Sequence, residues 1–315
     1  MLYVGLDVGG TSLKAGLVDE TGRILAKRTA PTGVERGAEA VVNDMAQLAI
    51  DVMADGGASL DEVASIGIGL PGILDPKTGR VPFCTNLYWH DVPVVELMHR
   101  VIDKPVYIEN DATVAGLAES VAGVSAGVKN SVFVTLGTGV GGGIIIDGKV
   151  YSGSNGVGSE VGHMITVAGG EQCTCGNRGC WERYASATAL IRMAKTALGN
   201  NTESLIYKSV NGKINDITAK TVIDAAKAGD KLALKIFDEY TYHLCVGLIN
   251  IINCLDPEVI VLGGGVSHAG DILLEAINKK LPELVFYKTM PRARVVLASL
   301  GNDAGIIGAA MLGRQ

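Results

Sequence analysis

The sequence predicts an α/β protein made of two related domains, and three observations lead to that prediction. The chain has 315 residues, a length that corresponds to about two domains. Segments with the alternation typical of strands and segments with helical spacing occur throughout the chain. Each half also opens with a strand, a turn rich in Gly and Thr, and a returning strand, at residues 2–17 and 131–147. This repeat is a weak internal duplication.

The first half is predicted to hold five strands and two helices. Leu13, Ala15 and Leu17 alternate with Ser, Lys and Gly, which favours a strand over a helix. Apolar residues between positions 36 and 56 recur at helical spacing and stop at a Gly pair. The expected strands are 2–6, 12–17, 23–28, 63–69 and 105–109, and the expected helices are 36–56 and 111 to about 122.

The second half is predicted to repeat the hairpin and then to become mostly helical. The expected strands are 131–136, 144–147, 258–262 and about 294–298, and the expected helices are about 183–198, 217–228, 231–254, 270–286 and one from about 303. We place the domain boundary near 118. Residues 1–118 then form a smaller N-terminal α/β domain on which a helix at about 301–315 packs back, and residues 119–300 form a larger α/β domain that carries a cysteine-rich loop.

Composition excludes several classes of function. The net charge is −6 and no long basic run occurs, so a broad nucleic-acid surface is not expected. The first residues lack the basic start of a signal peptide, and no apolar stretch reaches the length of about 18 residues that a membrane helix needs. We therefore expect a cytoplasmic protein with neither nucleic-acid nor membrane partners. In that setting, clustered cysteines indicate metal or redox chemistry before disulfides.

The motif Asp7-Val-Gly-Gly-Thr11 predicts a phosphate-binding turn between two strands. Backbone N–H groups of Gly9, Gly10 and Thr11 could form a nest for an anion. We also expect Lys14, on the returning strand, to contact the nucleotide. Asp7 could hold Mg²⁺ through water, because Mg²⁺ keeps much of its hydration. Taken alone, the motif is also compatible with an ordinary hairpin turn.

A second glycine turn lies at Gly137, Thr138 and Gly139. Its GxGxxG pattern is not a dinucleotide fingerprint, because a strand and not a helix is expected after it. Paired with the first turn, it could grip a polyphosphate from the other side. A third glycine turn at Gly264 and Gly265 follows a predicted strand, where ligands of open α/β sheets bind, and it could admit a purine. An ordinary strand-to-helix turn remains the alternative there.

Asn110 and Asp111 stand between a predicted strand and a predicted helix. By propensity, Asp111 is a good N-cap. A carboxylate at the end of a buried strand also suits a base that accepts a proton from a sugar hydroxyl, as the Asp of kinases does. Both interpretations stay open on the sequence pattern.

Three cysteines and one histidine form the most specific motif. His163 precedes Cys173, Cys175 and Cys180, with glycines between the cysteines. Three thiolates and an imidazole make a closed tetrahedral set for structural Zn²⁺, which would order a loop rich in glycine. Free thiols or a redox pair are the alternatives. Glu160 and Glu182 flank this loop, as solvated surface groups or as acceptors for sugar hydroxyls.

Together these residues resemble the ROK family of repressors and sugar kinases, from Tyr3 to Ala310. The most specific shared element is Glu160-Val-Gly-His163 followed by Cys173-x-Cys175-Gly-x-x-Gly-Cys180-x-Glu182. The first turn, the Asn110-Asp111 pair, the second turn and the Gly263-Gly-Gly265 turn occur in the family order. The resemblance implies an actin-like ATPase (ribonuclease H-like) fold, with two α/β domains around a cleft.

The resemblance also implies roles for individual residues. Asp111 would be the catalytic base that takes the proton of the sugar 6-hydroxyl. Other residues would match positions that hold the sugar, and His163 would match a zinc ligand as well; these are Asn86, Asn110, Glu160, His163 and Glu182. Family glucokinases often continue Asn-Asp-Ala-Asn, whereas this chain has Thr113, which could alter the packing beside the base.

The expected function is ATP- and Mg²⁺-dependent phosphorylation of glucose to glucose 6-phosphate by a homodimer or homotetramer. The alternatives are a kinase for N-acetylmannosamine, N-acetylglucosamine or fructose, a kinase that uses polyphosphate, and a non-catalytic sugar sensor or repressor. A repressor would carry a helix-turn-helix region ahead of Asp7, for which the sequence leaves no room. We expect zinc loss to weaken glucose binding and to leave nucleotide binding at the distant glycine turns nearly unchanged.

Overall fold

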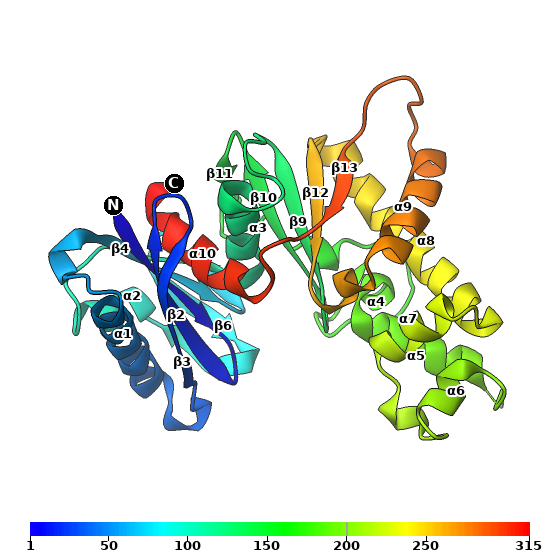
Figure 1. Ribbon diagram of the computed structural model, residues 1–315, viewed down its shortest axis with the longest axis horizontal. Coiled ribbons are helices and arrows are strands. Elements are labelled where there is room, and N and C mark those ends of the chain that lie inside the picture. The colour runs from blue at the N-terminus through cyan, green and yellow to red at the C-terminus, as the bar shows by residue number, and fades with distance from the viewer. Residues whose placement is uncertain (200) are drawn as a thin grey trace. The chain divides into compact units, whose positions relative to one another are not determined.

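The chain folds into two units in a computed structural model that describes residues 1–199 and 201–315 (Figure 1). The first unit comprises Met1–Phe133, Gly143–Ser159 and Ser299–Gln315, and the second comprises Val134–Gly142 and Glu160–Ala298. The predicted boundary at 118 falls inside one helix, α3 (Asp111–Ala122). The two units, which are defined by packing, thus divide the chain differently from the predicted domains. The boundary near 118 remains a prediction about domains that fold separately.

A five-stranded sheet forms the centre of the first unit, in the order β3-β2-β1-β4-β8. Its first three strands pair antiparallel, and β4 and β8 run parallel to β1. The alternation of Leu13, Ala15 and Leu17 places all three side chains in the core. The bounds are β1 (Leu2–Val8), β2 (Ser12–Asp19), β3 (Ile24–Pro31), β4 (Val63–Leu70) and β8 (Val106–Asn110).

Helices cover both faces of this sheet (Figure 1). On one face lie α1 (Ala38–Asp55) and α2 (Val94–His99), and on the other lie α3 and α10 (Ala304–Met311). The last helix lies close to the strands because Gly67 has no side chain: a Cβ there would lie 1.7 Å from the carbonyl oxygen of Ala309. The two ends of the chain are therefore packed together in one core.

A small antiparallel sheet in the first unit has no counterpart among the predicted elements. It consists of β5 (Ile73–Asp75), β6 (Arg80–Cys84) and β7 (Trp89–Val92), in that order. Only Val81, Cys84, Trp89 and Val92 among the residues of β6 and β7 are buried. Strands this short, with an irregular burial pattern, give no clear period of two in the sequence.

The second five-stranded sheet has the order β11-β10-β9-β12-β13. Its first two members in sequence, β9 and β10, each pass from one unit to the other. The predicted turn at 137–143 is shorter in the structure, because β10 already begins at Val140. The bounds are β9 (Ser131–Leu136), β10 (Val140–Ile146), β11 (Lys149–Val150), β12 (Val259–Gly263) and β13 (Arg294–Leu297).

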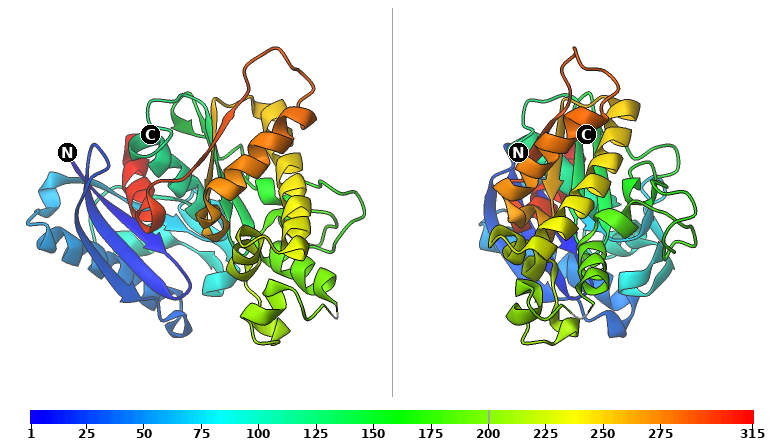
Figure 2. Two further views of the ribbon diagram at one scale, coloured as in Figure 1. Left: turned by 45° about the vertical axis from the view of Figure 1, so that its right-hand side comes forward. Right: turned by 90° about the vertical axis from the view of Figure 1, so that its right-hand side faces the viewer.

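The rest of the second unit is helical. Both views of Figure 2 show α8 and α9 side by side. The predicted helix at 183–198 is two helices, because Ser186 ends one and caps the next with its side chain on the N–H of Ala189. The bounds are α4 (Glu182–Ala185), α5 (Ala187–Leu198), α6 (Leu205–Ser209), α7 (Ala219–Lys227), α8 (Lys231–Leu255) and α9 (Asp271–Leu284).

Among the described residues, no helix combines the length and the apolar character that crossing a membrane requires.

Candidate active site

The first glycine turn joins β1 to β2 in the first unit. Its backbone closes through the N–H of Gly9, which donates to the carbonyl of Ser12 at 2.9 Å. Asp7 and Lys14 are paired across the two strands, and the Lys14 Nζ lies 2.9 Å from the Asp7 Oδ2. The turn therefore presents an ion pair beside its backbone donors, an arrangement that can bind a phosphate and its cation.

Asn86 lies against this turn. It belongs to the short 3₁₀ helix Thr85–Leu87, and a Cβ on Gly10 would lie 3.1 Å from the Asn86 carbonyl oxygen. The Asn86 side chain is exposed. The structure thus brings a predicted sugar contact beside the predicted phosphate turn.

Asn110 and Asp111 occupy the junction of β8 and α3. The Asn110 side chain is the N-cap, since its Oδ1 accepts from the N–H of Ala112 at 2.9 Å and of Thr113 at 3.3 Å. Asp111 is the first helical residue and is exposed, and its Oδ1 also accepts from the N–H of Ala112. The interpretation of Asp111 as the N-cap is therefore wrong, because Asn110 has that role. The Asn110 amide keeps its NH₂ group as a donor.

Glu109 is a buried carboxyl group that the sequence pattern did not single out. Its side chain is 5% exposed, accepts from the Ser152 hydroxyl at 2.5 Å and accepts from the N–H of Asn110 at 2.8 Å. Burial raises the pKa of Glu109, and these two hydrogen bonds oppose the shift. It therefore connects the strand end to the segment after β11.

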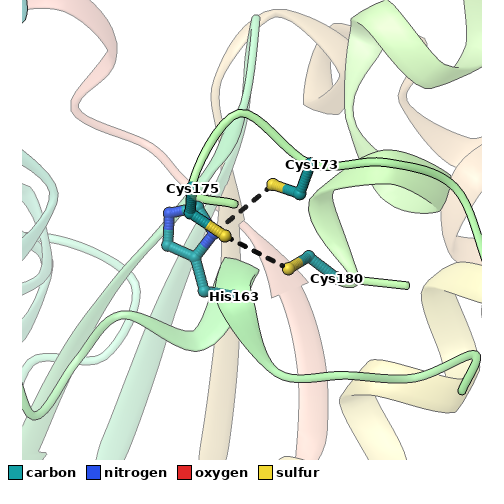
Figure 3. A group of neighbouring side chains, drawn as sticks. All are labelled: His163, Cys173, Cys175 and Cys180. Atoms are coloured by element: carbon teal, nitrogen blue, oxygen red, sulfur yellow. Dashed lines mark hydrogen bonds between the residues drawn. The ribbon is translucent and has the colours of Figure 1, made fainter. Parts of the chain in front are cut away.

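The structure gathers the four predicted zinc ligands in the second unit (Figure 3). Their ligand atoms all lie within 4.8 Å of one another. The Cys173 Sγ is 3.8 Å from the His163 Nδ1, and the Cys175 Sγ is 3.6 Å from the Cys180 Sγ. A tetrahedron with Zn–S arms of about 2.3 Å has edges of about 3.8 Å. The donor set and its spacing therefore fit Zn²⁺.

The thiols of this cluster differ in their surroundings. Burial raises the pKa of the Cys180 thiol to about 12, whereas the backbone N–H of Asn177 lowers the pKa of the Cys175 thiol. Without a metal ion, the Cys180 thiol would stay protonated at neutral pH. A coordinated metal ion deprotonates such a thiol outright, so the environment suits a metal ligand better than a free reactive thiolate.

His163 has its second ring nitrogen on the side away from the cysteines. The Nε2 lies 4.0 Å from the Glu160 Oε2, and Glu160 is exposed while His163 is half-buried. With Nδ1 beside the thiols, Nε2 and the Glu160 carboxylate are available together for a polar ligand. This pair is the part of the loop where a sugar hydroxyl could be held.

Glu182 lies between the cysteine cluster and the second glycine turn. Its Oε1 is 3.9 Å from the Cys173 Sγ, and its Oε2 accepts from the N–H of Val140 at 3.1 Å. The sequence-based expectation that the glycine turn is distant from the zinc loop is therefore wrong. A carboxylate has about four acceptor positions, so contact with a sugar hydroxyl remains open to it.

The third glycine turn adjoins the second. Gly264 has a φ of 80°, in the region that favours glycine, and a Cβ there would lie 2.7 Å from the backbone nitrogen of Leu136. Gly265 has open space around it. The second unit therefore brings both of these turns together with Glu160, His163 and Glu182, whereas the first unit holds the first turn, Asn86, Asn110 and Asp111.

Comparison with known proteins gives full-length similarity. The model of the ROK family matches residues 3–315. A protein called Glucokinase from Halalkalibacterium halodurans is 37% identical over 314 residues, which cover 99% of this chain and 95% of that protein. A protein called Glucokinase from Thermotoga maritima is 38% identical over 310 residues, covering 98% and 96%.

A solved structure shows the same similarity in three dimensions. It is a ROK family glucokinase from Streptomyces griseus in complex with glucose and AMPPNP, with a TM-score of 0.83 and 36% sequence identity. The match covers 100% of both chains. The resemblance therefore extends over the complete chain and both units.

Proposed function

This chain belongs to the ROK family, and from that membership we propose that it transfers the γ-phosphoryl group of ATP to the 6-hydroxyl of glucose. The actin-like ATPase fold expected from the family resemblance is confirmed. The observation that carries the proposal is the identity of 37% to a protein called Glucokinase over 99% of this chain. The arrangement of polar groups in each unit supports it.

Asp111 is the proposed catalytic base. It stands exposed at the start of α3, where Asn110 already supplies the helix cap. Its Oδ1 accepts from the N–H of Ala112, and a carboxylate has further acceptor positions, so it can also accept the proton of the sugar hydroxyl as the phosphoryl group is transferred. A base of modest strength is sufficient, because the transition state of phosphoryl transfer is loose.

The glycine turns are the proposed nucleotide site. In the first turn, Gly10 and Thr11 offer backbone N–H donors to phosphate oxygens beside Asp7 and Lys14, while the Gly9 N–H closes the turn on Ser12. In the second turn, Thr138 and Gly139 offer such donors, while the Gly137 N–H closes the turn on the Gly139 carbonyl. Mg²⁺, when bound with ATP, would neutralise phosphate charge, and Asp7 would hold it through water. The open space at Gly265 beside Gly264 suits the base of the nucleotide.

The sugar is proposed to bind to Asn86, Asn110, Glu160, His163 and Glu182. Zn²⁺ held by the Nδ1 of His163 and by Cys173, Cys175 and Cys180 would order the loop between them. The imidazole would then be fixed with Nε2 directed to Glu160. The metal is thus proposed as structural, with its effect on the sugar exerted through the orientation of one ring.

Location and assembly stay predictions. The six cysteines are free thiols, which suits a reducing compartment, and we propose a cytoplasmic enzyme. A homodimer or homotetramer is the assembly that we expect.

An assay of ADP release against a panel of sugars tests the proposal. With ATP and Mg²⁺, we expect turnover of glucose and none of 6-deoxyglucose, which lacks the accepting hydroxyl. N-acetylmannosamine, N-acetylglucosamine and fructose should be poorer substrates, and glucose 6-phosphate formation with polyphosphate in place of ATP should be slower. Turnover of an acetylated amino sugar alone would contradict the assignment.

A further inference from the structure

The second glycine turn is held by one short segment of chain. The N–H of Ala187 donates to the Gly137 carbonyl at 2.8 Å, and the Thr188 hydroxyl donates to the Thr138 carbonyl at 2.7 Å. The Val140 N–H donates to the Glu182 carboxylate at 3.1 Å. Residues 182–188 therefore bond to the turn on both sides of Gly139.

The Glu182 carboxylate lies directly against the turn at Gly139. A Cβ on Gly139 would lie 2.1 Å from the Glu182 Oε2, so the carboxylate occupies the space that a side chain would take. The absence of a side chain at Gly139 thus serves the approach of Glu182. A displacement of this glutamate would shift the backbone donor of Val140 with it.

The same segment begins at the cysteine cluster. Cys180 is a member of that cluster, and Trp181 between it and Glu182 is fully buried. The Trp181 Nε1 donates to the His243 carbonyl on α8 at 3.0 Å, and a Cβ on Gly247 would lie 1.9 Å from the indole Cε2. Three consecutive residues therefore connect the cluster, helix α8 and the glycine turn.

We propose that the His163–Cys173–Cys175–Cys180 cluster positions the nucleotide-phosphate turn as well as the sugar loop, through Glu182 and Thr188. Both act as positioning residues for the backbone N–H donors of Thr138 and Gly139, since the N–H groups of Gly137 and Val140 bond within the protein. The inference rests on the proposed function to the extent that this turn binds ATP phosphates. It predicts that loss of zinc weakens binding of both ligands, in contrast to the expectation from the sequence.

Replacement of Thr188 tests the connection without touching the sugar contacts or the metal ligands. Thr188→Val keeps the shape of the side chain and removes the hydroxyl bond to Thr138. We expect calorimetry to show Mg²⁺–AMPPNP binding weakened about fivefold to tenfold, the effect of one lost hydrogen bond. Glucose affinity and zinc content should be unchanged, and Thr188→Ser, which keeps the donor, should restore nucleotide affinity.

Thr196→Val is the matched control, because Thr196 is exposed on the same helix, α5. It should leave the affinity for Mg²⁺–AMPPNP at the wild-type value. Equal nucleotide affinities for Thr188→Val and Thr196→Val would overturn the positioning role of Thr188.

Removal of the metal tests the other end of the connection. Zinc is first measured by elemental analysis, with one ion per chain expected, and then removed by a chelator or by Cys175→Ser. Affinities for glucose and for Mg²⁺–AMPPNP should both fall at least fivefold. Weaker glucose binding with unchanged nucleotide binding, or a wild-type protein without zinc, would overturn the inference. Since these are binding measurements, they stand apart from the sugar panel, whose failure would reject the kinase assignment instead.

Discussion

Glu109 is a carboxyl group buried one residue before the pair that is proposed to handle the sugar. Its two oxygens are occupied, one by the Ser152 hydroxyl and one by the N–H of Asn110. Burial disfavours the charged form and raises the pKa of Glu109. Such a group stabilises the fold when it is protonated, so its contribution depends on pH.

The sign of that dependence follows from the raised pKa. The contribution of Glu109 is present below its ordinary pKa of 4.5 and is lost as pH rises through the folded-state pKa, because the folded state then binds more protons than the unfolded state. Glu109→Gln keeps an oxygen that accepts from the N–H of Asn110, can donate its amide NH₂ to the Ser152 oxygen in place of the bond it received, and cannot titrate. We expect the melting temperature of this variant, relative to wild type, to increase from pH 5 to pH 8.

Glu62→Gln is the control for that measurement. The Glu62 carboxylate accepts from the N–H and hydroxyl of Ser59, and these bonds lower its pKa. Its contribution is present above its ordinary pKa, so its loss should destabilise the protein at pH 8. A constant offset between Glu109→Gln and wild type at all pH values would contradict the assigned pKa direction.

At the scale of elements, α8 is shaped to accept Trp181. The helix carries Gly247 at the point where the indole packs, although Ala is favoured over Gly by about 1 kcal/mol inside helices. The added methyl group of Gly247→Ala would meet the ring, and overpacking of a core costs about 1–3 kcal/mol. We expect a melting temperature several degrees lower, although helix propensity alone predicts an increase.

Tryptophan fluorescence gives an independent readout of the same variant. The chain has two tryptophans, so Trp89→Phe leaves Trp181 as the single emitter. In that background, Gly247→Ala should shift the Trp181 emission, whereas Leu234→Ala at an exposed position of α8 should not. An unshifted spectrum with unchanged stability would mean that the helix accommodates the methyl group.

Most long elements could be predicted from the sequence because their signals are local. The alternation in β2 and the helical spacing in α1 reflect one buried face each. The sheet of β5, β6 and β7 could not be predicted, because its strands are short and their burial pattern is irregular. The glycines of β10 were assigned to a turn, whereas the strand already includes them. Gly143 packs closely on Thr113, and a contact with a residue so distant in sequence cannot be recognised from the local pattern.

At the scale of the whole molecule, the same distinction applies to the candidate site. The Cys₃His set could be predicted because its members lie within 18 positions of one another, from 163 to 180. The proximity of this set to the second glycine turn could not be predicted from the sequence, because residues 136–140 and 180–188 meet only through tertiary packing. Glu109 was missed for a related reason: nothing in the sequence distinguishes a buried glutamate from an exposed one.

The most direct test of the proposed reaction follows the phosphorus atoms of ATP by ³¹P NMR in the presence of glucose. Wild-type protein should form ADP and glucose 6-phosphate in equal amounts, with little inorganic phosphate. Asp111→Asn keeps the oxygen that bonds Ala112 but cannot accept the proton, so the rate should fall about 10²- to 10⁴-fold while calorimetry still detects glucose binding. Sugar phosphate formed by Asp111→Asn at a rate near that of wild type, or ATP converted by wild type to ADP and inorganic phosphate alone, would contradict the proposed mechanism.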